Sequence, residues 1–280
     1  DYRAVDNIEI KDKALKELHS LGFTTAHLAP DKGIFRGQTG VISLSDQLNS
    51  INSSVAQVID FKYRAKKNRE YPRSLLGVIA HIRQTFYDSD WYLKAQEIVQ
   101  EYPSENEPIS SNSSLESLGL SRALNKPFVF ISTNDNSSSR AINIVKEFKL
   151  SPWILGSGYE YRVLDYFDEV KPFFIMPINF PAKPNVTKPM SDLQFSTREL
   201  KHWDMAPDNL LYLTNSEFDF SITSHGLKKK NDFRKNLQRI IERGLNKDIV
   251  LAALTTQPAE ALGLEKSFGK IAKGYNANLV

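Results

Sequence analysis

Apolar residues recur along the chain with two spacings, and the alternation between them predicts the secondary structure. Spacing of three and four residues, as at Ala14, Leu15, Leu18 and Leu21, is typical of one helix face. Short runs rich in β-branched and aromatic residues, such as PFVFIS, are typical of strands. The expected strands are 23–30, 40–44, 55–63, 127–132, 152–155, 173–178 and 218–223. The expected helices are 11–21, 73–101 with a break near 88–90, 115–124, 138–148, 159–167, 197–213, 231–244, 247–255 and 258–262.

The order of these elements predicts an α/β fold. Strands alternate with helices through the second half, which is typical of a parallel sheet covered by helices. We count about seven strands, whereas a closed (β/α)8 barrel needs eight. Polar residues mark a serine-rich loop at 103–114 and a proline-rich loop at 181–196. No repeat and no linker divides the chain, so we expect a single domain over residues 1–280.

Composition excludes several kinds of site. With 41% apolar and 25% charged residues, the chain of 280 residues can bury a sizeable core. A net charge of +3 gives little reason to expect nucleic acid or an anionic membrane as a partner. No apolar run is long enough to cross a bilayer. The absence of cysteine excludes disulfides, thiolate metal ligands and a cysteine nucleophile.

His225 is the first candidate for chemistry. The expected strand 218–223 runs into Ser224, His225 and Gly226 just before a helix, where α/β enzymes often place working residues. Two interpretations stay open: a hydrogen-bonded residue at the mouth of the fold, or a metal ligand or acid–base group.

Two segments resemble the amidohydrolase superfamily. The end of the chain, IVLAALTTQPAEALGLEKSFGKIAKGYNANLV, matches the C-terminal signature of that superfamily at Ala253-Leu254-Thr255, Pro258-Ala259, Gly269, Ile271, Gly274, Ala277, Leu279 and Val280. LHSLGFTTAHLAPDKGIFRGQTGVISL, near the start, resembles its second barrel strand and the following loop. The stretches YPRSL at 71–75, IRQT at 82–85 and DWY at 90–92 resemble one branch, secreted bacterial proteins with two amidohydrolase-related domains.

The resemblance implies a fold and an activity. The fold would be a TIM-type (β/α)8 barrel truncated at its first strand and lacking the β-sandwich, with residues 2–10 as a candidate to fill the gap. The family hydrolyses carbon–nitrogen bonds with a metal-activated water. The branch implies a secreted or periplasmic location and a sister amidohydrolase-related domain in the same longer chain.

The family's metal ligands are missing at the positions that match. Ser132 and Asn134 stand after the fifth barrel strand and Ser157 after the sixth, where the family has histidines. His225 stands in place of the metal-bound aspartate, and Lys62 is the lysine nearest to the family's strand-four lysine. The resemblance therefore implies a mouth made of Ser132, Asn134, Ser157 and His225 with no metal, or zinc or another divalent ion if the family chemistry survives.

Other candidates have plainer interpretations. His27 is expected to fill the interior, and His19, His81 and His202 to lie on helix surfaces or cap them. Asp135 is expected to cap the following helix, with a carboxylate at the mouth as the alternative. Gly156-Ser157-Gly158 lacks the third glycine of a dinucleotide loop and does not match a Gly-x-Ser-x-Gly nucleophile. The basic runs 62–69 and 227–235 are expected to be solvated, and 181–196 to be a lid or a domain interface.

Three functions remain open at this point. The favoured one is a degenerate amidohydrolase-related domain that binds a ligand or supports its sister domain. The second is part of an active metal-dependent hydrolase once an upstream segment is present. The third is a non-catalytic module that binds a small molecule, a peptide or a sugar in a groove lined by Trp153, Tyr159, Phe180 or Trp203.

Overall fold

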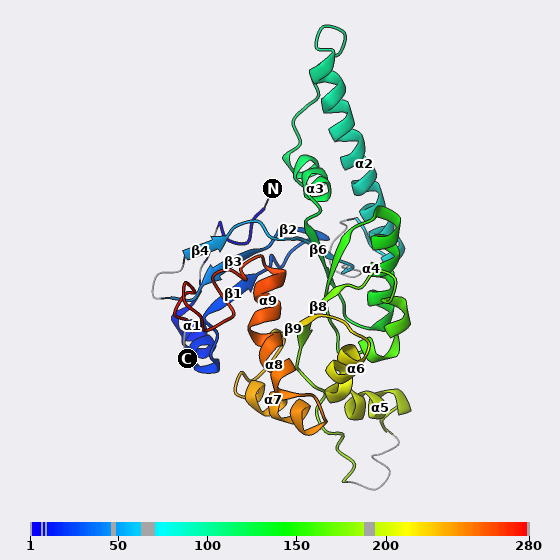
Figure 1. Cartoon of the computed structure of the whole chain (residues 1–280). Coiled ribbons are helices and arrows are strands. Elements are labelled where there is room, and N and C mark those ends of the chain that lie inside the picture. Colours follow the sequence, from blue (N-terminus) through cyan, green and yellow to red (C-terminus); the bar gives the residue numbers. More distant parts are fainter. Residues whose placement is uncertain are drawn as a thin grey trace. The chain divides into compact units, whose positions relative to one another are not determined.

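The computed structural model describes residues 2–6, 8, 10–45, 49–62, 71–187 and 194–278 (Figure 1). Its contacts divide the chain into two compact units, which we describe separately. Unit 1 comprises Asp1–Glu9, Thr25–Ile131 and Arg140–Pro152, and unit 2 comprises Ile10–Thr24, Ser132–Ser139 and Trp153–Val280. The units interleave in sequence, so no single linker marks a boundary, and the expected single domain stays a prediction.

Unit 1 contains two groups of strands. Three antiparallel strands pair in the order β1-β3-β4, with bounds Thr25–Leu28, Gly40–Ser43 and Asn49–Asn52. In the other group β2 (Phe35–Gln38) pairs antiparallel with β5 (Gln57–Asp60), and β5 pairs parallel with β6 (Pro127–Ile131). Among these described strands, the β5–β6 pair alone has the parallel arrangement that the alternation predicts.

The strands β2 and β4 were not predicted, and for β2 a glycine explains why. β2 contains Gly37, which lies at φ 104° beside a register shift, so this stretch has the composition of a turn. A Cβ at Gly37 would collide with the carbonyl oxygen of Tyr2, which accepts the Gln38 N–H at 2.8 Å. An isolated parallel bridge joins Arg3 to Gln38, so part of segment 2–10 lies along β2.

Two helices of unit 1 form an antiparallel pair, α2 (Leu75–Glu101) and α3 (Ser113–Ala123) (Figure 1). The predicted break near 88–90 is wrong, because α2 is continuous. Ser89 is buried and donates its hydroxyl to the Leu115 carbonyl at 2.8 Å, and Asp90 forms an ion pair with Arg122. Ser89 and Asp90 therefore bond α2 to α3, and the helix α2 continues through them.

Aromatic side chains fill the core of unit 1. Phe86 on α2 stacks on Phe148 at a centroid distance of 4.7 Å and meets Phe128 of β6 at 5.8 Å. Phe148 ends α4 (Asp135–Phe148), whose first residues belong to unit 2.

Unit 2 contains parallel strands and short helices. β7 (Ser151–Leu155) pairs parallel with β8 (Phe173–Pro177) from Trp153 on, and β8 pairs parallel with β9 (Phe220–Thr223). The helices are α1 (Asp12–Leu21), α5 (Thr197–Met205), α6 (Asn209–Asn215), α7 (Asp232–Glu242), α8 (Lys247–Leu254) and α9 (Thr256–Ala261). These elements confirm the predicted parallel sheet and the α/β class.

Two expected helices of unit 2 differ in the structure. Residues 159–167 form two short 3₁₀ turns, η1 (Glu160–Arg162) and η2 (Leu164–Tyr166). Residues 197–213 are divided by the 3₁₀ turn η4 (Ala206–Asp208), which contains Pro207. Among the described strands of either unit, none closes its sheet into a barrel.

Candidate functional site

The four residues expected at the mouth all belong to unit 2. Ser132 and Asn134 follow β6 in sequence, Ser157 follows β7, and His225 follows β9. Ser132 contacts Asn134, whereas Ser157 contacts Glu160 and the His225 N–H contacts Thr223.

Ser132 and Asn134 organise the start of α4. The buried Ser132 Oγ lies 2.9 Å from the Asn134 carbonyl oxygen and 2.6 Å from the Ser138 hydroxyl. The Asn134 side-chain oxygen accepts the Ser137 N–H at 3.0 Å, which is the contact of an N-cap. The expectation that Asp135 caps this helix is therefore wrong, because Asn134 does so one residue earlier.

Ser157 belongs to a turn that closes around a buried carboxylate. Glu160 is fully buried, and its Oε1 accepts the Ser157 N–H at 2.6 Å and the Ser157 hydroxyl at 2.9 Å. Its Oε2 accepts the Gly158 N–H at 2.9 Å and the Asn209 amide at 2.8 Å. The glycine-rich turn that resembles half a phosphate loop thus binds an anion from its own chain.

His225 is exposed at the end of β9, and its backbone N–H lies 3.2 Å from the Thr223 hydroxyl oxygen. Its backbone therefore takes part in a local turn after the strand. Lys62 is also exposed, and its backbone N–H bonds the Asp60 carboxylate at 3.1 Å.

These residues do not fit a divalent metal. The described part of the chain contains no group of three or more His, Asp or Glu side chains placed to hold an ion. The Ser132 and Ser157 hydroxyls are engaged in the hydrogen bonds given above, and Asn134 caps a helix. Zinc needs nitrogen, thiolate or carboxylate donors that converge on one point.

A charged cluster lies beside these residues in unit 2. The Asp135 carboxylate receives Arg162 Nε at 3.2 Å on one oxygen and Arg198 Nη2 at 3.0 Å on the other. The Asp135 side chain is 10% exposed, and those of Arg162 and Arg198 are 36% and 51% exposed. Two cations thus share one largely buried carboxylate, and the alternative interpretation of Asp135 as a mouth carboxylate stays a prediction.

His202 completes this cluster and corrects another expectation. It is buried, not a surface or capping residue, and its ring stacks on Tyr159 at a centroid distance of 3.5 Å and an angle of 13°. Burial, assisted by Arg162 and Arg198 and opposed by Asp135, lowers the pKa of His202 to about 4. The imidazole is therefore neutral at pH 7. We call Asp135, Tyr159, Arg162, Arg198 and His202 the arginine–aspartate cluster.

The sequence contained little signal for this cluster. Arg162 and Arg198 are 36 positions apart and belong to no motif, so only folding brings them to Asp135. His202 is one polar residue on a helix whose first turn carries a capping box at Ser196 and Glu199.

The remaining candidates are structural. His27 lies in β1 opposite Val41 and is half-buried, and burial lowers its pKa to about 4. Its expected place in the barrel interior stays a prediction. His19 is exposed on α1, and His81 on α2 packs edge-on against Phe35 and Tyr71.

Other predictions concern segments that the structure describes only in part. Lys228 and Lys229 are exposed, as expected for the second basic run. Most of 62–69, the centre of 181–196, and Leu279 and Val280 lie outside the described residues. Trp153 is buried against Phe173, so it does not line a groove.

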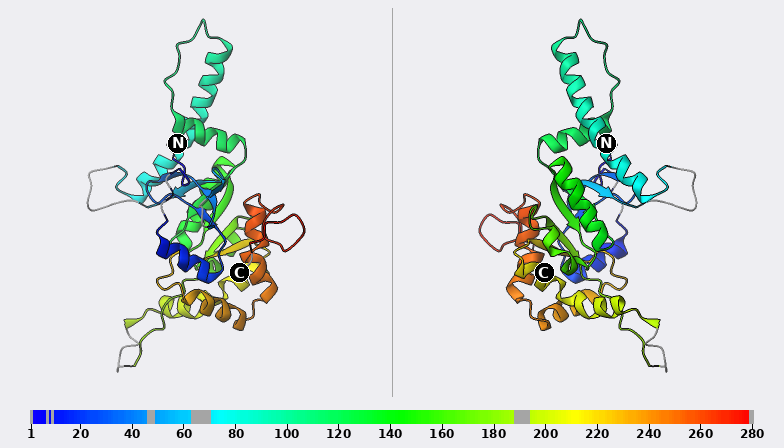
Figure 2. Two further views of the ribbon diagram at one scale, coloured as in Figure 1. Left: turned by 90° about the vertical axis from the view of Figure 1, so that its left-hand side faces the viewer. Right: turned by 90° about the vertical axis from the view of Figure 1, so that its right-hand side faces the viewer.

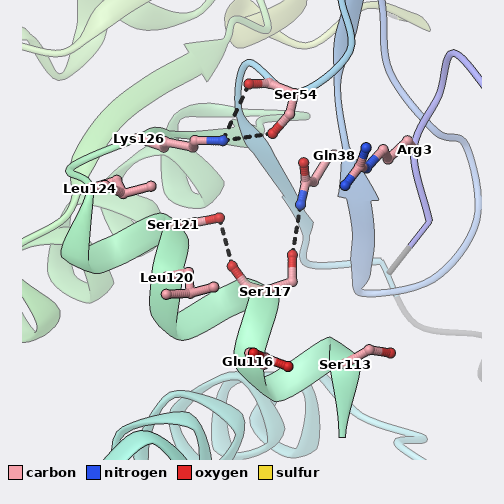
Figure 3. A pocket seen from close by; sticks show the side chains of 10 residues that line it. All are labelled: Arg3, Gln38, Ser54, Ser113, Glu116, Ser117, Leu120, Ser121, Leu124 and Lys126. Carbon is pink, nitrogen blue, oxygen red and sulfur yellow. Dashed lines mark hydrogen bonds between the residues drawn. The ribbon is translucent and has the colours of Figure 1, made fainter.

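Unit 1 contains a separate polar pocket of about 260 Å³ between α3 and β2 (Figure 3). The Gln38 amide donates to the Ser117 hydroxyl at 2.6 Å, and Lys126 Nζ donates to the Ser54 hydroxyl at 2.7 Å. Ser54 and Ser117 therefore bond to other side chains of the pocket, and the sequence did not predict this pocket. The lining residues are Arg3, Gln38, Ser54, Ser113, Glu116, Ser117, Leu120, Ser121, Leu124 and Lys126.

Comparison with known proteins identifies the fold. The chain matches no family model and no curated protein sequence. It superposes on an amidohydrolase from Thermotoga maritima MSB8 with a TM-score of 0.75 and 19% identity, covering 95% of this chain and 68% of the other. The predicted relationship to amidohydrolases is thus confirmed for the fold.

Two further solved structures match more weakly. A prolidase complexed with N-methylphosphonate-L-proline has a TM-score of 0.43 and 15% identity, over 80% of this chain and 60% of the other. An uncharacterized metal-dependent hydrolase from Pyrococcus furiosus has a TM-score of 0.42 and 14% identity, over 62% of this chain and 37% of the other. Among the helices that the structure describes, none has the length and apolar character of a membrane span.

Proposed function

We propose that this chain is a degenerate amidohydrolase-fold domain that binds a small anionic ligand and no longer carries out metal-assisted hydrolysis. The observation that carries the proposal is the arginine–aspartate cluster, which lies in unit 2 with the positions where the family has metal ligands. In this proposal the parallel strands belong to a (β/α)8-type barrel. The chain is part of a longer secreted protein, and its ligand-bound form supports the sister domain of that protein.

The charge of the cluster supports an anionic ligand. Arg162 and Arg198 bring two positive charges to one carboxylate, and His202 stays neutral at pH 7. A guanidinium group has five N–H donors in a planar fork that fits a carboxylate or a phosphate. Each arginine gives one close contact to Asp135 and keeps a third or more of its side chain exposed to solvent.

Calorimetric titration with inorganic phosphate, benzoate and the neutral amide benzamide tests the ligand class. We expect heat from one or both anions, none from benzamide, and loss of binding in Arg198→Gln. The matched control is Lys201→Gln, an exposed cation on the same helix, which keeps binding. Equal binding of benzamide, no binding of either anion, or unchanged affinity in Arg198→Gln would overturn the anion site.

Elemental analysis tests the loss of metal chemistry independently. The whole chain is exposed to zinc and dialysed into metal-free buffer, and we expect far less than stoichiometric zinc. About one zinc retained per chain would contradict the proposal and make His225 the first ligand to substitute.

The similarity to the Thermotoga maritima amidohydrolase favours one alternative. In it, the chain contributes part of an active metal-dependent hydrolase of carbon–nitrogen bonds, completed by an upstream segment with the His-x-His pair. An upstream-extended chain would then bind metal and hydrolyse amides, whereas a degenerate domain gains neither.

A further inference from the structure

Helix α2 carries large apolar side chains on two opposite faces. Its inner face, with Val78, Ile82, Phe86 and Tyr92, is buried in unit 1. On the opposite face Tyr87, Trp91 and Ile98 are 55%, 62% and 51% exposed, and Tyr102, the C-cap of the helix, is 49% exposed. Tyr87 also packs edge-on against Phe148 at a centroid distance of 5.2 Å. At 3.6 residues per turn these four directions fall within an arc of about 60°. We call these four residues the outer face of α2.

An exposed face of this kind needs an explanation, because large contiguous apolar surfaces of a helix are normally covered by another element or a partner. Figures 1 and 2 show the C-terminal half of α2 extending past the strands of unit 1, so the strands do not cover that half. Aromatic side chains are also the residues enriched at the centres of protein interfaces.

The charges beside the outer face indicate what covers it. Arg83, Asp90, Lys94 and Glu101 follow one edge of that face, with charges that read plus, minus, plus, minus. Arg83 and Glu101 each lie nine positions from Tyr92, and Asp90 and Lys94 each lie two positions from it. Reversing the helix about residue 92 therefore places every charge of this edge opposite one of the other sign.

We propose that a second copy of this chain packs antiparallel on the outer face of α2, with the two-fold axis beside residue 92. In an antiparallel helix pair the same edge of each helix meets its counterpart, so Arg83 lies opposite Glu101 of the second copy, and Lys94 opposite Asp90. The Trp91 side chains of both copies lie next to the axis. A two-fold interface uses one patch twice, as this arrangement does.

The expected dimer is weak but specific. Aromatic side chains bury about 150–250 Å² each when fully covered, so the exposed parts of three aromatic residues per copy reach several hundred Å². Ile98 and the charged edge bring the contact to roughly the 1,000 Å² that a specific interface needs. Arg83 also pairs with Glu147 at 2.7 Å and Asp90 with Arg122, so the pairs between copies set register more than affinity.

Sedimentation of the whole chain over a range of concentrations tests the proposal. We expect a reversible monomer–dimer equilibrium that Trp91→Glu abolishes. Arg83→Glu places like charges together twice per dimer and is expected to weaken it about ten-fold, and adding Glu101→Arg restores opposite charges and the association. Tyr166→Glu, an exposed aromatic in unit 2, is the matched control that leaves the dimer intact.

Spin-label distances between the two copies measure the register separately. Because the chain has no cysteine, a single cysteine can be introduced and labelled at one position at a time. A label at position 94 lies about 6 Å along the axis from its counterpart, and a label at 101 about 27 Å, since each residue adds 1.5 Å on each helix. A parallel pair would give similar distances at both positions. Circular dichroism checks that each variant is folded.

Three results would overturn the inference. They are a chain that stays monomeric at every concentration, a dimer that survives Trp91→Glu, and a double charge swap that fails to rescue. Capture of a different protein by the outer face, without self-association, would do the same.

Discussion

Glu160 shows how one buried side chain can determine the shape of a turn. Its two carboxylate oxygens accept four hydrogen bonds from Ser157, Gly158 and Asn209, with no exposure to solvent. A carboxylate that leaves water needs such donors, because a buried charge without partners costs several kcal/mol. The sequence GSGYE therefore forms a self-bound turn, where glycine content alone suggested a ligand loop.

Replacing Glu160 by Gln tests this interpretation. The amide NH₂ group would face N–H donors on one side, so we expect a loss of about 1–3 kcal/mol in the free energy of unfolding. Urea denaturation measures it, and Glu260→Gln on the exposed surface of α9 should change stability by less than about 0.5 kcal/mol. Equal stability of the two variants would contradict the role of the buried carboxylate.

His202 makes stability depend on pH. Its pKa is about 4 in the folded chain and near 6.5 in the unfolded chain, so protons bind the unfolded state preferentially between these values. The contribution of the neutral imidazole is complete above pH 6.5 and is lost as the pH falls towards 4. His27 acts in the same direction.

The difference between His202→Phe and the unchanged chain isolates this residue. We expect the variant to lose less free energy of unfolding between pH 7.5 and pH 5, because it removes a group whose protonation favours unfolding. His19→Gln, at an exposed position, should keep the original slope. Identical pH dependence of His202→Phe and the unchanged chain would show that His202 is not the titrating group.

Among the elements, α4 depends on the residue before its first turn. The Asn134 side chain caps the Ser137 N–H, which leaves Asp135 available to hold Arg162 and Arg198. Asn134 thus caps the helix and Asp135 forms the ion pairs, although asparagine and aspartate are both favoured at N-caps. Sequence alone could not assign them, since it shows neither arginine near Asp135.

Asn134→Ala should therefore destabilise the chain by about 1 kcal/mol, the typical value of an N-cap. Asn136→Ala is the matched control, because Asn136 is an exposed helix residue and alanine favours helices. Thermal and urea unfolding compare the two. A larger loss in Asn136→Ala than in Asn134→Ala would show that the cap lies elsewhere.

At the scale of the whole molecule, the spacing of apolar residues predicted those helices and strands whose own sequence carries a buried face or run. The helix α2 and the parallel strands β6, β8 and β9 were predicted near their observed bounds, because buried elements need continuous apolar runs or faces. The strands β2 and β4 were missed, since their polar and glycine-containing sequences become strands only by pairing with β5 and β3.

The predicted mouth of Ser132, Asn134, Ser157 and His225 stays a prediction. Ser132, Asn134 and Ser157 were identified by alignment to missing ligands, and the structure gives them capping and turn-forming contacts. The arginine–aspartate cluster needed distances that no motif encodes. Chemistry assembled from residues far apart in sequence is visible only after folding.

The interleaving of the two units has a consequence for the order in which the chain can fold. Unit 1 needs Arg140–Pro152, and unit 2 needs Ile10–Thr24, so neither is a continuous piece of the polypeptide. During synthesis, before residues 140–152 have been added, unit 1 lacks its last segment, and unit 2 has only Ile10–Thr24 and Ser132–Ser139 of its three segments. Neither unit can reach its native state before much of the other has been synthesised. Apolar side chains of the incomplete units therefore stay exposed in the nascent chain. Any shortened version cut between residues 24 and 140 inherits the same defect permanently.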